Sequence, residues 1–193
     1  TNPVDTTMAL AKGARSGGAM IFENQEVLEL LTNAGGICGV RTSAGEISAN
    51  KVVLASGMWS RQLAATIGVS IPLQAAEHFY IVTEPMQTLT AGMPTLRVPD
   101  EQAYFKEDAG KLLLGAFELE AKPWSVDGVP ADFAFGTLPD DMDHFAPIME
   151  TAIKRFPALE HAGIQLSFNG PESFTPDDRY LLGPTAEYSN LFV

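Results

Sequence analysis

The sequence predicts a mixed fold of helices and strands (α/β, α+β), with an antiparallel sheet in its second part. A helix-forming segment at residues 2–16 precedes a buried strand at 52–55 that runs into another helix. Two strand-like runs, 103–107 and 111–120, are separated by a short glycine-containing turn, as in a hairpin. Residues 142–156 repeat apolar side chains at helical spacing. This order is typical of an α/β part joined to an antiparallel part.

The first part of the chain is predicted to be a helix followed by short strands. Asn2 can cap a helix over residues 2–16, Pro3 suits its first position, and Gly17 with Gly18 ends it. Turns rich in glycine, asparagine and alanine then separate four strand-like runs. These runs are residues 19–22, 27–32, 37–42 and 52–55.

The second part is predicted to be mostly strand with one long helix. A short helix at residues 59–67, ended by Gly68, leads into strands at 76–85, 103–107 and 111–120. The long helix carries Pro147, which must lie near its start or kink it.

The chain closes with a predicted strand, turn and strand at residues 164–184, and the terminal run SNLFV has the character of a beginning strand. We therefore expect a first domain from residues 1–72, a second from 73–168, and a return to the first over 169–193. Both ends of the chain have the character of cut ends.

The composition is that of an acidic chain. It has 193 residues, a formal net charge of −12 and a pI near 4.5, which argue against nucleic acid or an anionic membrane as a partner. No stretch approaches the roughly 20 apolar residues that span a bilayer. Cys38 is the single cysteine, and its strand-like setting predicts a buried, unreactive thiol. The three histidines lack metal-ligand spacing, so we expect no metal site.

The segment VVLASG, residues 52–57, is a buried strand that ends in small residues. Ligands of open α/β sheets bind beyond the carboxyl ends of strands, and a glycine there lets the backbone approach a ligand closely. The same residues also fit a core strand that turns a corner, and Trp59 also fits core packing. No GxGxxG follows a strand and no GxSxG occurs in these residues, so neither a phosphate cradle nor a hydrolase elbow is indicated.

Two side chains of the second part are candidates for proton chemistry. His78 and Tyr104 each lie in a predicted strand, and each also fits an ordinary structural role. His144 and His161 lie in or near the long helix and are expected to be exposed. The segment FNGPESFTPDDRYLLGP combines glycines, prolines, carboxylates and an arginine, which is typical either of simple turns or of a binding loop.

Five stretches, taken in order, resemble the FAD-dependent amine oxidoreductases of the dimethylglycine and sarcosine dehydrogenase group, which are D-amino-acid-oxidase-like flavoproteins. They are VDTTMALAKGARSGGAMIFENQEV, VVLASGMWSRQLA, PLQAAEHFYIVTEP, LRVPDEQAYFKE and FNGPESFTPDDRYLLGP. The resemblance covers nearly the whole chain. It implies a central fragment: part of a Rossmann-like FAD-binding domain plus an antiparallel-sheet substrate domain. Without the GxGxxG unit of the family, these residues alone are not expected to bind FAD or to be active.

The resemblance assigns four residues to the cofactor. Val27 matches a position whose backbone contacts the adenine side of FAD. Gly57, Met58 and Trp59 match a strand tip that lies close to the cofactor.

The resemblance also assigns His78 and Tyr104 to the active site. Oxidation of an N-methyl amine moves a hydride from the N–CH₃ carbon to the flavin, and the amine must first be neutral. A histidine can take that proton near neutral pH, and a tyrosine hydroxyl can orient the histidine or the substrate.

The implied function is oxidative demethylation of an N-methyl amino acid such as dimethylglycine or sarcosine, with FAD as cofactor. Two alternatives stay open: a non-catalytic regulatory or binding subunit that keeps the fold, and a flavin oxidase of another amine. Folate binding through a region outside these residues and homo-oligomer formation are also expected. The expected location is the bacterial cytoplasm or, in a eukaryote, the mitochondrial matrix.

Overall fold

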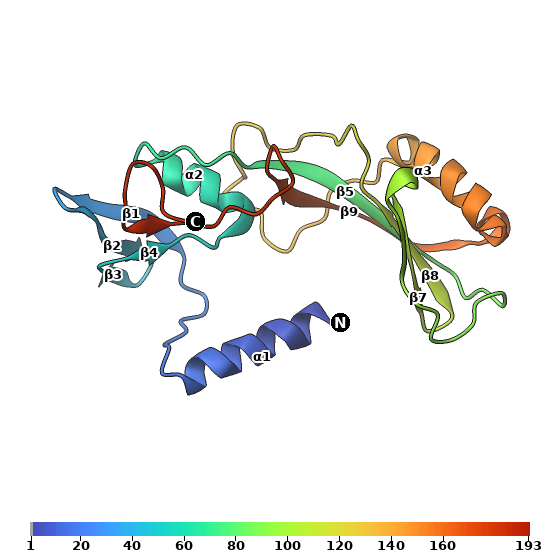
Figure 1. The fold of residues 1–193 in the computed structure, drawn as a ribbon, viewed down its shortest axis with the longest axis horizontal. Coiled ribbons are helices and arrows are strands. Elements are labelled where there is room, and N and C mark those ends of the chain that lie inside the picture. The colour runs from blue at the N-terminus through green and yellow to red at the C-terminus, as the bar shows by residue number, and fades with distance from the viewer. Residues whose placement is uncertain (1) are drawn as a thin grey trace. The chain divides into compact units, whose positions relative to one another are not determined.

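A computed structural model describes residues 2–193, and its fold is the predicted mixture of helices and sheets (Figure 1). The chain divides into two compact units. The first comprises the described residues up to Leu54 together with Leu63–Val69 and Leu182–Val193. The second comprises Ala55–Gln62 and Ser70–Leu181.

The first unit opens with the predicted helix, α1 (Pro3–Ser16). The Asn2 side chain accepts hydrogen bonds from the backbone N–H groups of Val4 and Asp5, which confirms the predicted cap. The prediction of a strand at residues 19–22 is wrong. These residues form an irregular segment, and Met20 is 82% exposed. No strand among residues 2–193 lies alongside them, so their backbone groups have no ladder to join.

Three antiparallel strands follow, β1 (Val27–Asn33), β2 (Gly36–Thr42) and β3 (Gly45–Ser48). The sequence predicted the first two strands and both turns but not β3, whose residues are exposed and carry little apolar character. Cys38 lies in β2 and is half-buried.

The strand predicted at residues 52–55 is only two residues long, β4 (Val52–Val53). It pairs in parallel with β10 (Leu191–Phe192), the strand predicted at the C-terminus. The Asn190 side chain extends this contact, because it bonds to both backbone groups of Ile37 and to the Asn50 carbonyl.

The segment after β4 begins with a 3₁₀ turn, η1 (Gly57–Trp59), and continues as helix α2 (Ser60–Ala65). The predicted helix at 59–67 is therefore present but shorter. Gly68 ends the region with a φ of +78°, which glycine adopts without strain.

The second unit is built on an antiparallel sheet of five strands in the order β6-β7-β8-β5-β9. The strands are β5 (Gln74–Thr83), β6 (Leu96–Val98), β7 (Ala103–Asp108), β8 (Lys111–Ala116) and β9 (Ile164–Phe174). The predicted hairpin is β7–β8, and its turn residues Ala109 and Gly110 both have positive φ, of 52° and 79°.

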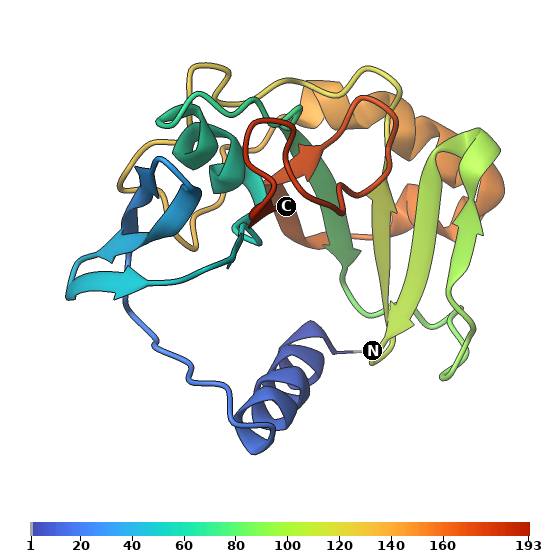
Figure 2. The same cartoon turned by 60° about the vertical axis from the view of Figure 1, so that its left-hand side comes forward.

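One face of this sheet is covered by helix α3 (Met142–Arg155), as Figure 2 shows. Phe145, Ile148 and Ala152 of the helix pack on apolar side chains of the sheet, including Phe79 and Leu114. Pro147 lies inside the helix near its start, as its sequence position predicted. Two 3₁₀ turns, η2 (Pro99–Glu101) and η3 (Pro157–His161), complete the unit.

The segment FNGPESF forms the end of β9, so it is neither the simple turn nor the binding loop that its composition indicated. Gly170 pairs with His78 and Pro171 pairs with Glu77. A proline is tolerated here because β9 is an edge strand, so the missing N–H need not serve a second neighbour. The carboxylate of Glu172 is thereby placed on a rigid strand.

The opposite face of the sheet is not covered by α3. Along β5 the side chains alternate between buried and half-buried, with Phe79 and Ile81 facing α3 and His78 and Tyr80 facing the other way. We call this second surface the open face. It is defined by His78, Tyr80, Arg97, Tyr104, Phe117, Phe168 and Glu172.

Candidate functional site

The open face brings together His78 and Tyr104, the two residues predicted to act in proton chemistry. The Nε2 atom of His78 lies 3.4 Å from the Tyr104 hydroxyl, at the long end of a hydrogen bond. Phe117 joins them, with its ring centroid 4.6 Å from that of His78 and 5.9 Å from that of Tyr104. The His78 side chain is 15% exposed, so it is reachable yet held by its aromatic neighbours.

Gly115 makes room for the Tyr104 ring. In the sheet, Tyr104 is the direct partner of Gly115, and a Cβ atom on Gly115 would lie 2.1 Å from the Tyr104 hydroxyl. The absent side chain lets the ring lie across the neighbouring strand toward His78. The orientation of the tyrosine therefore depends on glycine at this position.

The Tyr104 hydroxyl stays protonated under ordinary conditions. Burial raises the pKa of Tyr104, and the nearby Glu172 carboxylate and Tyr80 raise it further. A neutral hydroxyl can both donate and accept a hydrogen bond. The site thus contains a fixed donor beside the imidazole.

Two charged side chains flank this pair, and the sequence reasoning named neither as a site residue. The Glu172 carboxylate lies 3.8 Å from Nδ1 of His78. The guanidinium carbon of Arg97 lies 5.4 Å from the centroid of the Phe117 ring. The only signal for them in the sequence is the alternation of side chains along each strand combined with the register, and the register is not visible before folding.

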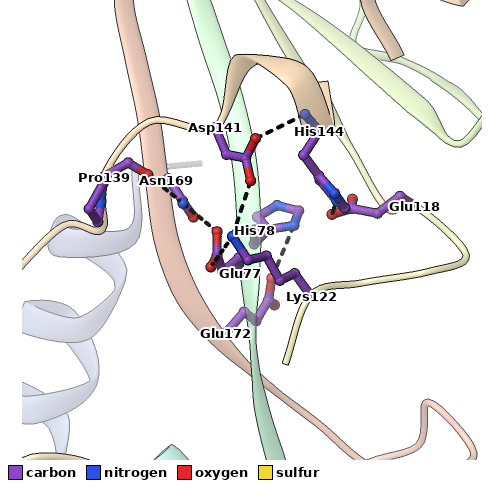
Figure 3. A network of polar contacts seen from close by, with 9 residues as sticks. All are labelled: Glu77, His78, Glu118, Lys122, Pro139, Asp141, His144, Asn169 and Glu172. Carbon is purple, nitrogen blue, oxygen red and sulfur yellow. Dashed lines mark hydrogen bonds and ion pairs between the residues drawn. The ribbon is translucent and has the colours of Figure 1, made fainter. Parts of the chain in front are cut away.

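A separate polar network lies on the α3 side of the sheet, directly behind His78 (Figure 3). Asn169 donates a hydrogen bond of 2.7 Å to Glu77 and one of 2.8 Å to the Pro139 carbonyl. Lys122 forms ion pairs with Glu77 and with Asp141. These contacts tie β5 to β9 and to the start of α3, so they fix the backbone that carries His78.

His144 also belongs to this network, which corrects the expectation that it is exposed. Its Nε2 atom lies 3.0 Å from Glu118, and its ring contacts Phe79 at a centroid distance of 5.2 Å. His161 is exposed, as predicted. Of the three histidines, only His78 lies on the open face and contacts the Tyr104 hydroxyl.

Asp141 caps α3 and is charged under neutral conditions. The backbone N–H of His144 and the Lys122 ammonium lower the pKa of Asp141, while Asp141 and Glu77 raise the pKa of Lys122. Because the folded pKa of Asp141 lies below its ordinary value of 3.8, its stabilising effect is present above that pH. The effect is lost as pH falls through the lower, folded value.

We expect Asp141→Asn to weaken the start of α3 at neutral pH while keeping the cap acceptor. Amide exchange in the first turn of the helix should be faster than in the parent by about two- to five-fold at neutral pH, the range of an exposed ion pair. The difference should shrink as pH falls below 3.8 and vanish once the parental carboxylate is also protonated. Hydrogen–deuterium exchange of a peptide covering residues 138–148 measures this, with Asp143→Asn as control. A difference between Asp141→Asn and parent that does not change with pH would contradict the ion-pair explanation.

The four residues predicted to contact a cofactor lie in two units. Val27 begins β1 in the first unit and is 40% exposed. Gly57, Met58 and Trp59 form η1 in the second unit, where Trp59 is 38% exposed. Gly57 has a φ of +56°, and no atom lies within 4 Å of the position a Cβ would take. A flat ligand can therefore approach this backbone closely.

Within residues 2–193, no group of three or more histidine, cysteine or acidic side chains is placed to hold a metal ion. In the same residues, no helix has the length and apolar character needed to cross a membrane.

The second unit thus combines an imidazole–phenol pair on one face of an antiparallel sheet with an open glycine backbone in η1. The family model described as FAD dependent oxidoreductase (DAO) matches residues 1–193. The chain belongs to this FAD-dependent oxidoreductase family.

Relatives with assigned names match the chain over nearly its whole length. It is 42% identical over 192 residues to 4-methylaminobutanoate oxidase (formaldehyde-forming) of Paenarthrobacter nicotinovorans, covering 100% of this chain and 23% of that protein. It is 35% identical over 197 residues to mitochondrial sarcosine dehydrogenase of Homo sapiens, covering 100% of this chain and 21% of that protein.

A further relative has a different kind of name. The chain is 35% identical over 192 residues to the mitochondrial pyruvate dehydrogenase phosphatase regulatory subunit of Mus musculus, covering 98% of this chain and 22% of that protein. The chain thus spans less than a quarter of the length of each of these relatives.

A solved structure shows the same fold. L-proline dehydrogenase from P. horikoshii superposes with a TM-score of 0.79 at 23% identity, covering 100% of this chain and 49% of that one. This likeness confirms the mixed fold and its antiparallel sheet.

The cofactor of the family is FAD, and the residues of η1 leave room for it. The open, left-handed backbone at Gly57 leaves space for a planar ring system, and the neighbouring Trp59 offers exposed aromatic surface.

Proposed function

We propose that the full-length protein is an FAD-dependent oxidoreductase that oxidatively demethylates an N-methyl amino acid. The observation that carries this proposal is the convergence of His78 Nε2 and the Tyr104 hydroxyl, 3.4 Å apart on the open face of the substrate-side sheet. Relatives named as sarcosine dehydrogenase and 4-methylaminobutanoate oxidase support the choice of an N-methyl amine as substrate.

His78 acts as the proton acceptor in this proposal. A secondary or tertiary amine is an ammonium in neutral water, and only its neutral form has the lone pair that assists loss of hydride from the N–CH₃ carbon. The Glu172 carboxylate, 3.8 Å from Nδ1, favours a proton on that nitrogen. Nε2 is then the nitrogen that accepts the substrate proton, and Glu172 stabilises the imidazolium that results.

Tyr104 and Phe117 position the substrate beside His78. The Tyr104 hydroxyl, kept neutral by its raised pKa, can hold the imidazole in place. The Phe117 ring, 4.6 Å from the imidazole, forms an apolar wall against which an N-methyl group can pack.

Bound FAD supplies the two-electron acceptor that takes the hydride from the N–CH₃ carbon. We propose that the Gly57–Trp59 segment lies against this cofactor and that the Val27 backbone contacts its adenine side. Water then adds to the substrate iminium, and the carbon leaves as formaldehyde with the demethylated amine as the second product.

Product analysis tests the proposal. The full-length protein, incubated with sarcosine, dimethylglycine or 4-methylaminobutanoate and an electron acceptor, should release formaldehyde and demethylated amine in equal amounts. Turnover of other amines without formaldehyde would favour the same-fold oxidase of another amine. An FAD-containing protein that turns over neither these substrates nor the other amines would contradict both possibilities.

A regulatory subunit is the second candidate, and the relative named as a phosphatase regulatory subunit is the observation that favours it. In that case the open face would bind without catalysing. The two candidates differ in one result: a regulatory subunit gives no substrate-dependent formaldehyde, whatever its FAD content.

The location and the partners belong to the proposal as well. Two of the named relatives are mitochondrial, and we propose the mitochondrial matrix in a eukaryote or the cytoplasm in a bacterium as the location. Coupling to folate and formation of a homo-oligomer are further proposals. Both would involve parts of the protein outside the open face.

A further inference from the structure

The Arg61 side chain connects the start of α2 to two other segments of the second unit. One guanidinium nitrogen donates a hydrogen bond of 2.8 Å to the Gln74 side-chain oxygen, and another donates one of 3.2 Å to the Val126 carbonyl. All three residues belong to the same compact unit. Arg61 comes two residues after Trp59, so these contacts hold the helical turn that directly follows η1.

Gln74 is the junction of these contacts. It begins β5, four residues before His78. Its side-chain oxygen accepts from Arg61, and its side-chain nitrogen donates to the carbonyls of Trp124 at 2.9 Å and of Ala75 at 2.8 Å. The amide therefore uses its oxygen and both of its N–H groups, which fixes its orientation.

The segment 122–129 is attached to both α2 and β5. The backbone N–H of Val129 donates a hydrogen bond of 2.7 Å to the Gln62 side chain of α2. Near the other end of the segment, the backbone N–H of Trp124 donates to the Ala75 carbonyl of β5 at 2.8 Å. The start of α2 and the start of β5 are thus joined by the side-chain contact and, in parallel, by this segment.

These contacts join the two parts of the second unit between which the hydride moves in the proposed reaction. The segment η1, which is proposed to lie against FAD, directly precedes α2. The strand β5 carries His78, and η1 also approaches β9, the neighbour of β5 in the sheet. Transfer between two oriented groups depends steeply on their spacing, and a displacement of about 1 Å can cost about 10²-fold in rate.

We propose that Arg61 and Gln74 are positioning residues for hydride transfer. Their contact sets the spacing between the cofactor-side segment η1 and the strand that holds the substrate beside His78. Neither side chain touches the substrate or the cofactor in this assignment. The inference rests on the proposed function, because it concerns the geometry of that same reaction.

Three variants of the full-length holoenzyme and a matched control test this role. Arg61→Met removes the donors from a side chain of similar length, Arg61→Lys keeps one charged donor group, and Gln74→Met removes the acceptor. The control is Arg155→Met, which removes an exposed arginine of the same unit that pairs with Glu101 of η2. The substrate is whichever of sarcosine, dimethylglycine and 4-methylaminobutanoate reduces the parental flavin fastest.

In Arg61→Met, the limiting rate of flavin reduction without oxygen should fall about 10-fold, the effect of a displacement smaller than about 1 Å. The substrate concentration that gives half of this rate should stay within about two-fold of the parental value, because no substrate contact is lost. Arg61→Lys should recover part of the rate. Combining Arg61→Met with Gln74→Met should add no further loss, since both remove the same contact. Arg155→Met should keep the parental rate.

A second measurement does not depend on turnover. Hydrogen–deuterium exchange of the FAD-loaded protein without substrate should be about two- to five-fold faster in Arg61→Met than in the parent, in peptides that cover residues 56–66 and 122–129. The same peptides should be unchanged in Arg155→Met, and both variants should keep the parental FAD content.

Three results would overturn the assignment. One is a parental rate of flavin reduction in Arg61→Met. Another is unchanged exchange in both peptides, which would mean that the contact does not hold the start of α2. The third is an equal loss of rate in Arg155→Met, which would mean a general loss of stability. Failure of the proposed function has a different signature, because the parental flavin would then stay oxidised with all three substrates, and the role in hydride transfer would fall with it.

Discussion

Replacing His78 with alanine is expected to slow flavin reduction in the full-length protein by about 10²- to 10⁴-fold at neutral pH, the usual contribution of a positioned general base. The substrate would then have to lose its ammonium proton to water. The rate of His78→Ala should therefore rise with pH, as the fraction of neutral substrate amine in solution increases. Rapid mixing of substrate with the oxidised enzyme, without oxygen, measures the rate.

The matched control is His161→Ala, which removes an exposed histidine of the same unit. It should reduce its flavin at the parental rate. A parental rate in His78→Ala, with an unchanged pH profile, would show that the amine is deprotonated elsewhere. In that case the imidazole would be a structural group of the sheet.

Gly115→Ala is expected to slow flavin reduction by about 10²-fold, because a displacement of about 1 Å in a catalytic group can cost that much. The new methyl group would occupy the space of the Tyr104 ring end, 2.1 Å from both its Cζ and its hydroxyl oxygen. The ring must leave its present position beside His78 and Phe117, which disturbs the proposed place of the substrate. Tyr104→Phe, which loses only the hydroxyl, should have a smaller effect of about 10-fold.

Gly163→Ala is the control for introducing a methyl group. Its Cβ would lie 2.6 Å from the Glu84 carboxylate, an exposed side chain that can turn away into solvent. This variant should keep the parental rate. If Gly115→Ala also reduced its flavin at the parental rate, the position of the Tyr104 ring would not matter for the reaction.

Local sequence signals were enough for most elements of the fold. The cap at Asn2, the β7–β8 turn and the apolar periodicity of α3 each depend on neighbouring residues, and each is present in the structure. The wrong predictions concern segments whose structure depends on strands that are distant in the sequence. Residues 19–22 have strand character but no neighbouring strand, and FNGPESF has turn character but pairs with β5 along its length.

The site was partly predictable for the same reason. Residue type and family resemblance indicated His78 and Tyr104, and the structure places them 3.4 Å apart, although their roles stay predictions. Arg97 and Glu172 acquire meaning only through the register of β6 and β9, which no local pattern specifies. Gly115 is a similar case, because its lack of a side chain leaves the space that the Tyr104 ring fills.

The most direct test of the central claim is to mix the full-length protein, carrying oxidised FAD, with an N-methyl amino acid in the absence of oxygen. The open face with its His78–Tyr104 pair predicts that the visible absorption of the oxidised flavin disappears with sarcosine, dimethylglycine or 4-methylaminobutanoate. A flavin that stays oxidised with all three substrates, in a protein that binds FAD, would contradict the account.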